Sequence, residues 1–179
     1  MGEVRTPQRV QFFCGVIYAP QAPVAKIRSE LESLFGPIEF ESPVFNFDFT
    51  DYYREEMGSE LEKIFFAFEN LLLPDEIVEA KIKTNEIESR YALFDNIGEG
   101  RIANLDPGYV TLAKMVLATT KDFAHRIYLR DGIFAEITLT FKKHGFTDFP
   151  WTYPDYKTNE YLSFFNELRA RYKNKLENC

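Results

Sequence analysis

The run Gln8–Tyr18 near the N-terminus limits the possible folds of this chain more than any other segment. Its sequence, QRVQFFCGVIY, is apolar on both alternating faces. A strand with water on one face shows alternation between apolar and polar residues, whereas a strand buried on both faces is apolar throughout. We therefore predict that Gln8–Tyr18 forms a central strand of a sheet.

The segments that follow alternate between helical and strand-like patterns. Apolar residues recur at helical spacing over 23–35, and Gly36-Pro37 is a strong stop signal for a helix. Residues 38–49 predict a strand, because Phe45, Phe47 and Phe49 fall on one face with polar residues opposite. The segment 60–73 fits both a helix and a strand, and we favour a strand because it is rich in Phe and ends at Pro74.

The second half of the chain continues the alternation. Helical spacing runs from Pro74 to about Phe94, and a proline is tolerated in the first turn of a helix. A short strand is predicted over 101–105, followed by a turn at Asp106-Pro107-Gly108. A further strand over 114–120 leads to a β-hairpin around Asp131-Gly132, which is a strong hairpin signal. An apolar stripe over 158–176 predicts a C-terminal helix.

This order of elements defines the expected fold class. Residues 8–105 read as β-α-β-β-α-β, which is the order of the ferredoxin-like split βαβ pattern. We predict a single α+β domain over residues 1–179, with a ferredoxin-like core extended by a β-hairpin and closed by a C-terminal helix. A length of 179 residues is enough for one domain with a sizeable core.

Composition and charge narrow the classes of partner. The net charge of −7 and a pI near 5.0 argue against nucleic-acid binding through phosphate contacts. The two cysteines form no motif, which is typical of a protein from a reducing compartment. The N-terminus lacks the apolar segment of a signal peptide, and no apolar run reaches transmembrane length. We expect a cytoplasmic protein that binds neither nucleic acid nor membrane.

Acid–base chemistry is the first candidate function, because one of the two histidines lies in the hairpin. A two-residue turn places Leu129 opposite Phe134 and Ile127 opposite Glu136, so that His125 is a diagonal neighbour of Glu136. His125 is the candidate catalytic base, with Glu136 as the carboxylate that orients it. The alternatives are a structural pair that bridges two strands, or a salt bridge between Glu136 and Arg126.

A dense polar stretch between residues 101 and 140 supplies the candidate ligand-binding residues. Cations and hydroxyl groups in such a cluster suit an anionic or phosphorylated ligand. Asn104 and Asp106, together with Glu86 or Glu88, could instead hold Mg²⁺. The sequence Asp106-Pro107-Gly108 is more typical of a turn, so we predict no metal site. The sequence leaves the identity of any cofactor unknown. The candidate ligand-binding residues are Asn104, Asp106, Lys114, Thr120, Lys121 and Arg126.

Several segments of the chain resemble a known prokaryotic family. They are TNEIESRYAL (84–93), NLDPGYVTLAKMVLATTKDFAHRIYL (104–129), GIFAEITLTF (132–141) and PWTYPDY (150–156). The family is known as domain of unknown function 4416, and the likeness extends over the whole chain. The resemblance implies a small cytosolic bacterial or archaeal protein. Some members carry the label of a GTP-binding protein, and the resemblance supplies no catalytic residues.

The residues themselves give no support to the GTP label. The chain has no G-x-x-x-x-G-K-[ST] motif, so no phosphate-binding loop of that type is encoded. Two function hypotheses therefore remain. The first is a small-ligand-binding protein or enzyme for an anionic or phosphorylated metabolite, including nucleotides. The alternative is a non-catalytic, self-associating interaction or scaffold protein, which the aromatic residues and extended strands motivate.

Overall fold

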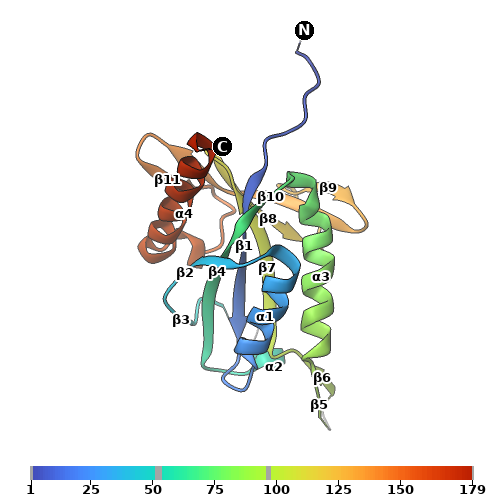
Figure 1. Ribbon diagram of the computed structural model, residues 1–179. Helices are drawn as coiled ribbons and strands as arrows, with labels where there is room; N and C mark the ends of the chain where they lie inside the picture. Colours follow the sequence, from blue (N-terminus) through green and yellow to red (C-terminus); the bar gives the residue numbers. More distant parts are fainter. Residues whose placement is uncertain (1, 51–53, 96–97, 179) are drawn as a thin grey trace.

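The computed structural model describes residues 2–50, 54–95 and 98–178 (Figure 1). Most of its strands belong to a large antiparallel sheet. These strands are β1 (Val10–Tyr18), β2 (Ile38–Glu41), β3 (Phe45–Phe47), β4 (Leu61–Leu72), β7 (Ala103–Val110), β8 (Lys114–Thr119), β9 (Ile127–Arg130), β10 (Ile133–Lys142) and β11 (Gly145–Asp148). They follow the order β11-β10-β8-β7-β1-β4-β2, with β3 paired to β4 and β9 paired to β10.

The helices lie on both faces of this sheet. They are α1 (Val24–Phe35), the short α2 (Arg54–Met57), α3 (Ile77–Arg90) and α4 (Asn159–Glu177). A separate two-stranded ribbon joins β5 (Leu93–Asp95) to β6 (Gly98–Gly100). The α+β class and the C-terminal helix are therefore confirmed, and in the described part of the chain no helix is long and apolar enough to cross a membrane.

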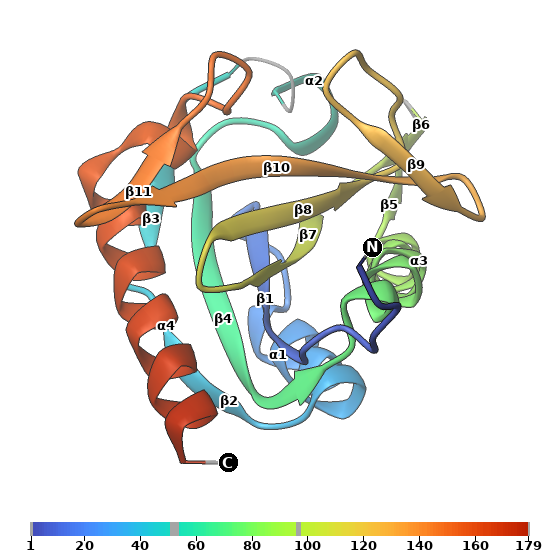
Figure 2. The same cartoon turned by 90° about the horizontal axis from the view of Figure 1, so that it is seen from above.

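The prediction of a central first strand is confirmed. Every residue of β1 is buried, and β1 pairs antiparallel with β4 on one edge and with β7 on the other. Alternate side chains of β1 point to opposite faces. Phe12 packs in the cluster that contains Leu31 of α1 and Ile87 of α3, whereas Phe13 packs with Phe165 of α4. Figures 1 and 2 show α1 and α3 together on one side of the sheet and α4 on the other.

Two expected elements form close to the predicted positions. The ambiguous segment 60–73 is the strand β4, and it is buried over most of its length. The C-terminal helix begins after Thr158, whose side chain accepts a hydrogen bond from the Tyr161 amide and so caps the helix. Burial of Phe164, Phe165 and Leu168 against the sheet then stabilises this helix.

The predicted turn at Asp106-Pro107-Gly108 is wrong, because β7 runs straight through it. Pro107 pairs with Cys14 of β1, and Gly108 pairs with both Phe13 of β1 and Leu117 of β8. A side chain at Gly108 would place its Cβ 2.4 Å from the Val116 carbonyl oxygen. The glycine is therefore required by close approach of two strands and not by a turn.

The predicted strand over 38–49 is divided in two. β2 and β3 pair separately with β4, and a break at Ser42–Val44 lies between them. Pro43 cannot donate a backbone hydrogen bond, which is a physical reason for the break. Phe49 lies beyond the end of β3.

The hairpin turn at Asp131-Gly132 is confirmed, but the predicted register is wrong. Arg130 pairs with Ile133 as expected, after which Tyr128 pairs with Phe134 and Ile127 with Ala135. A bulge on β9 leaves Leu129 as the extra residue and shifts the pairing. His125 precedes β9 and is not part of a strand.

The segment PWTYPDY (150–156) connects β11 to α4. Its side chains form hydrogen bonds with the part of the β10 edge that lies between β9 and β11. β9 pairs with one end of β10 and β11 with the other end. Between them the Trp151 Nε1 donates to the Ile137 carbonyl at 3.0 Å, and the Thr152 Oγ1 donates to the Thr138 carbonyl at 2.5 Å. Side chains thus satisfy backbone groups that no strand covers.

Candidate functional site

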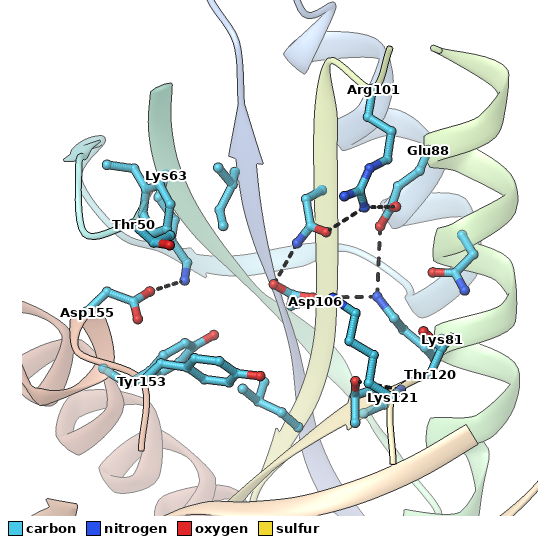
Figure 3. Close-up of a pocket in the computed structure, with 18 of the residues that line it drawn as sticks. Thr50, Lys63, Lys81, Glu88, Arg101, Asp106, Thr120, Lys121, Tyr153 and Asp155 are labelled. Carbon is cyan, nitrogen blue, oxygen red and sulfur yellow. Dashed lines mark hydrogen bonds and ion pairs between the residues drawn. The ribbon is translucent and has the colours of Figure 1, made fainter. Parts of the chain in front are cut away.

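A cavity of about 810 Å³ opens where β7 and β8 separate. The two strands pair at Gly108–Val110 of β7, and closer to the cavity they diverge, so that Asp106 and Thr119 no longer face each other as a pair. Helix α3 and the segment 153–156 supply further walls. The fork in the sheet therefore creates the space, and polar side chains from several elements line it (Figure 3).

One wall is the polar face of α3. Lys81, Asn85 and Glu88 are spaced so that they share one side of the helix, and all three line the cavity. The Lys81 Nζ donates to the Leu105 carbonyl at 2.7 Å. It also lies 3.5 Å from the Asp106 Oδ1 and 3.8 Å from the Glu88 Oε1. A buried lysine is thus compensated by two carboxylates.

Glu88 carries a perturbed carboxyl group. It is 7% exposed, and burial raises the pKa of Glu88 above its usual value. Lys81 and a 2.7 Å hydrogen bond from the Leu105 amide act in the opposite direction, while Asp106 adds to the rise. A titratable group of this kind in a cavity is a feature of many functional sites.

Arg101 connects the cavity wall to the segment around α2. Its Nε donates to the Glu56 Oε2 at 2.9 Å, and its Nη1 contacts both the Glu88 Oε2 at 3.4 Å and the Asn104 Oδ1 at 3.1 Å. Asn104 in turn donates to the Asp106 Oδ2 at 2.8 Å. The result is a continuous polar network, in which Asn104 and Asp106 share one face of β7 as the Asn-x-Asp spacing predicts.

The opposite wall holds a buried ion pair. The Lys63 Nζ lies 2.6 Å from the Asp155 Oδ2, and the two residues are 1% and 5% exposed. The same ammonium group lies 4.3 Å from the centroid of the Tyr156 ring and near three other aromatic rings. Aromatic faces and one carboxylate together offset the cost of burying this cation.

Glu136 lies at the junction between the cavity and the hairpin. Its Oε2 accepts from the Arg126 Nε at 2.9 Å and lies 3.2 Å from the His125 Nε2, and its Oε1 accepts from Thr138 at 3.0 Å. The expected proximity of His125 and Glu136 therefore exists, despite the shifted register. The His125 ring stacks on Trp151, outside the group of residues that line the cavity.

The structure brings five of the eight predicted site residues together on the cavity. Arg126 does not line the cavity itself, but it contacts two residues that do. It donates to the Lys121 carbonyl at 3.0 Å and to the Tyr153 hydroxyl at 2.6 Å. Lys114 lies at the opposite end of β8, away from the cavity. The predicted residues that line the cavity are Asn104, Asp106, Thr120, Lys121 and Glu136.

Sequence reasoning missed Lys63, Lys81, Arg101 and Asp155. Two of them carry a signal in retrospect: Lys63 interrupts the apolar run LEKIFFAF, and Arg101 precedes the Asn-x-Asp pair. The positions of Lys81 and Asp155 depend on which helix and loop cover the sheet, which single-residue patterns do not reveal. Among the described residues, no group of three or more His, Cys, Asp or Glu side chains is placed to hold a metal ion.

Comparison with known proteins gives a family but no described activity. The sequence profile of a domain of unknown function (DUF4416) matches residues 8–172 of the 179-residue chain. The chain therefore belongs to this family, as the motifs between residues 84 and 156 indicate. No curated protein and no solved structure matches.

Proposed function

We propose that this protein binds a small anionic or phosphorylated metabolite in the cavity between β7 and β8. One observation carries the proposal: besides Lys63, which is paired with Asp155, three cations from separate segments line this space. They are Lys81 of α3, Arg101 between β6 and β7, and Lys121 just after β8. In Figure 3 the side chain of Lys121 extends toward Asp106 and Lys81. The ammonium group of lysine and the guanidinium group of arginine commonly bind phosphate.

The entrance near Lys121 suits a phosphate group best. Thr119 and Thr120 line the cavity beside Lys121, and they add hydroxyl groups to its ammonium group. Deeper in the cavity, Glu88 and Asp106 balance Lys81. A ligand with its anionic group at Lys121 and neutral polar groups toward Asp106 therefore meets complementary partners along the cavity.

The proposal has a catalytic extension, in which His125 acts as an acid or base toward the bound ligand. The 3.2 Å contact between its Nε2 and the Glu136 Oε2 supports it. Glu136 lines the cavity and His125 does not, so a proton would pass between His125 and the ligand through Glu136. Binding is thus the part of the proposal that the geometry supports most directly.

The binding proposal is tested by thermal-shift measurements with nucleotides, sugar phosphates and divalent metals. A ligand at 100 times its dissociation constant adds about 2.7 kcal/mol to the stability of the folded state. We expect a phosphorylated compound to raise the melting temperature, and Lys121→Ala to reduce this rise. Lys114→Ala is the matched control, because it removes a lysine from the other end of β8. Equal loss in both variants, or no rise with any compound, would contradict the proposal.

We also propose that β1, β2, β4 and β7 with α1 and α3 form a ferredoxin-like core. Supporting observations are the antiparallel order β7-β1-β4-β2 and the position of both helices on one face of the sheet. An experimental structure aligned with ferredoxin-like domains would test this assignment. Superposition that fails for α1 or α3 would contradict it.

Self-association is the second candidate function, and one surface favours it. β9 pairs with β10 along one edge, and its apolar side chains are exposed: Ile127 by 69%, Tyr128 by 58% and Leu129 by 39%. Exposed apolar strands at a sheet edge are typical sites of strand pairing between copies. Light scattering should then show a dimer that Tyr128→Lys dissociates, whereas a strict monomer at high concentration would exclude it.

A further inference from the structure

The end of the cavity near β3 and β4 differs in character from the end near Lys121. Phe47, Phe49 and Tyr156 line it, together with the ring of Tyr153, whose hydroxyl reaches Arg126 beside the Lys121 carbonyl. Phe49 and Tyr153 are 37% and 42% exposed, although both are large aromatic residues. Phe47 packs on Phe49 with ring centroids 5.9 Å apart, and Tyr153 packs on Tyr156 at 6.5 Å. Partly exposed aromatic rings that line a cavity form surfaces on which a planar group can stack.

The charges at this end cancel. The ammonium group of Lys63 is paired with the carboxylate of Asp155 at 2.6 Å, and both residues line the cavity. Burial raises the pKa of Tyr156 well above its usual value, so its hydroxyl stays protonated and neutral at physiological pH. An uncharged group therefore suits this end better than a second anion does.

One hydrogen-bond donor at this end is unused. The Tyr156 hydroxyl is buried and has no hydrogen-bond partner among the described residues. Buried hydroxyl groups in folded proteins nearly always have a partner, so an unsatisfied one is informative. Within the described part of the chain the Tyr161 hydroxyl is also buried without a partner, but Tyr161 does not line the cavity. The chain thus offers two similar hydroxyl groups, one at the cavity and one away from it.

From these three observations we infer that this end is a subsite for an uncharged planar ring that bears a hydrogen-bond acceptor, such as a ring carbonyl. The inference rests on the proposed function, and it adds that the ligand carries a ring in addition to its anionic group. The ring stacks against Phe49 and Tyr153, and its acceptor accepts a hydrogen bond from the Tyr156 hydroxyl. Since Tyr156 is 2% exposed, the partly exposed ring of Tyr153 has to shift from its hydrogen bond with Arg126 to admit the acceptor.

The two ends can be probed separately with three kinds of compound. Ribose 5-phosphate carries the phosphate without a planar base, uridine and inosine carry a carbonyl-bearing base without the phosphate, and their 5′-monophosphates carry both. Calorimetric titration of the full chain should show that at least one monophosphate binds about tenfold or more tightly than ribose 5-phosphate. If ribose 5-phosphate binds as tightly as both monophosphates, the ring subsite is excluded while the proposed function stands.

Substitution of single hydroxyl groups locates the ring. Tyr156→Phe should weaken the monophosphate about tenfold and leave ribose 5-phosphate unchanged, because it removes the donor and keeps the ring. Tyr161→Phe is the matched control and should leave both affinities unchanged. Equal effects of the two substitutions, or no effect of Tyr156→Phe, would overturn the inference. If no compound of either kind binds, the proposed function fails, and the inference fails with it.

Discussion

The Lys63 Nζ and the Asp155 Oδ2 lie 2.6 Å apart, although 92 positions separate the two residues in the chain. The pair joins β4 to the 3₁₀ turn (Asp155–Lys157) that precedes α4. Both side chains are almost completely buried, with side-chain exposed fractions of 1% for Lys63 and 7% for Asp155. The contact therefore links β4 to the segment that carries Tyr153 and Tyr156.

Substitution of Lys63 or Asp155 alone should reduce stability more than substitution of both residues together. Lys63→Met leaves a buried carboxylate without its cation, and Asp155→Leu leaves a buried ammonium group without its anion. We expect each single substitution to lower the free energy of unfolding by about 3–5 kcal/mol. The double variant should lose less than either single variant, and denaturant titration of all four proteins measures the free energies of unfolding. Additive losses would show that the two charges are not coupled.

Close approach of β7 and β8 at Gly108 predicts a strong steric effect. The Cβ of Gly108→Ala would lie 2.4 Å from the Val116 carbonyl oxygen and 2.7 Å from the Phe13 Cζ. Overpacking of this kind typically costs about 1–3 kcal/mol. At Gly132 a Cβ meets no atom within 4 Å, but the φ of +77° makes alanine strained there by about 1 kcal/mol. Chemical denaturation should therefore show a larger loss for Gly108→Ala than for Gly132→Ala, and the reverse order would contradict the packing described for this strand pair.

The raised pKa of Glu88 predicts a specific dependence of stability on pH. The folded state holds the Glu88 proton more tightly than the unfolded state does, so this group reduces stability as pH rises from the ordinary glutamate pKa of about 4.3 through the raised value. Below that pH window Glu88 is protonated in both the folded and the unfolded state, so it does not affect the free energy of unfolding. Glu88→Gln removes the effect, and its stability relative to the wild type should therefore increase as pH rises across the window.

A control on the same helix separates this effect from general charge effects. Glu86 is about half exposed and pairs with Lys83 at 3.0 Å. Glu86→Gln should follow the pH profile of the wild type, measured as the free energy of unfolding in urea at several pH values. Parallel profiles for Glu88→Gln and the wild type would show that Glu88 titrates normally.

The sequence predicts the local elements of this fold well where one signal dominates. β1 and α4 have apolar patterns that match their burial, and the turn at Asp131-Gly132 forms as its residues predict. Prediction failed where tertiary packing changes the meaning of a residue. Pro107 and Gly108 are typical turn residues, yet they lie in β7, where both pair with β1 and β8 approaches Gly108 closely.

The candidate site follows the same division. Asn104 and Asp106 could be placed on one face because strand alternation is a local property, and Lys121 follows directly from the end of β8. The partners Lys81, Lys63 and Asp155 come from elements whose position depends on the whole sheet. The prediction of Lys114 as a site residue rests on its charge alone. Lys114 lies at the end of β8 that is remote from the cavity.

The central claim is that the cavity between β7 and β8 binds a phosphorylated ligand through Lys121. Calorimetric titration of wild type, Lys121→Ala and Lys114→Ala with ribose 5-phosphate and the two nucleoside monophosphates tests it most directly. The account predicts saturable binding of at least one compound to the wild type, about tenfold weaker binding to Lys121→Ala, and unchanged binding to Lys114→Ala. Absence of binding to the wild type, or equal affinity in all three proteins, would contradict it.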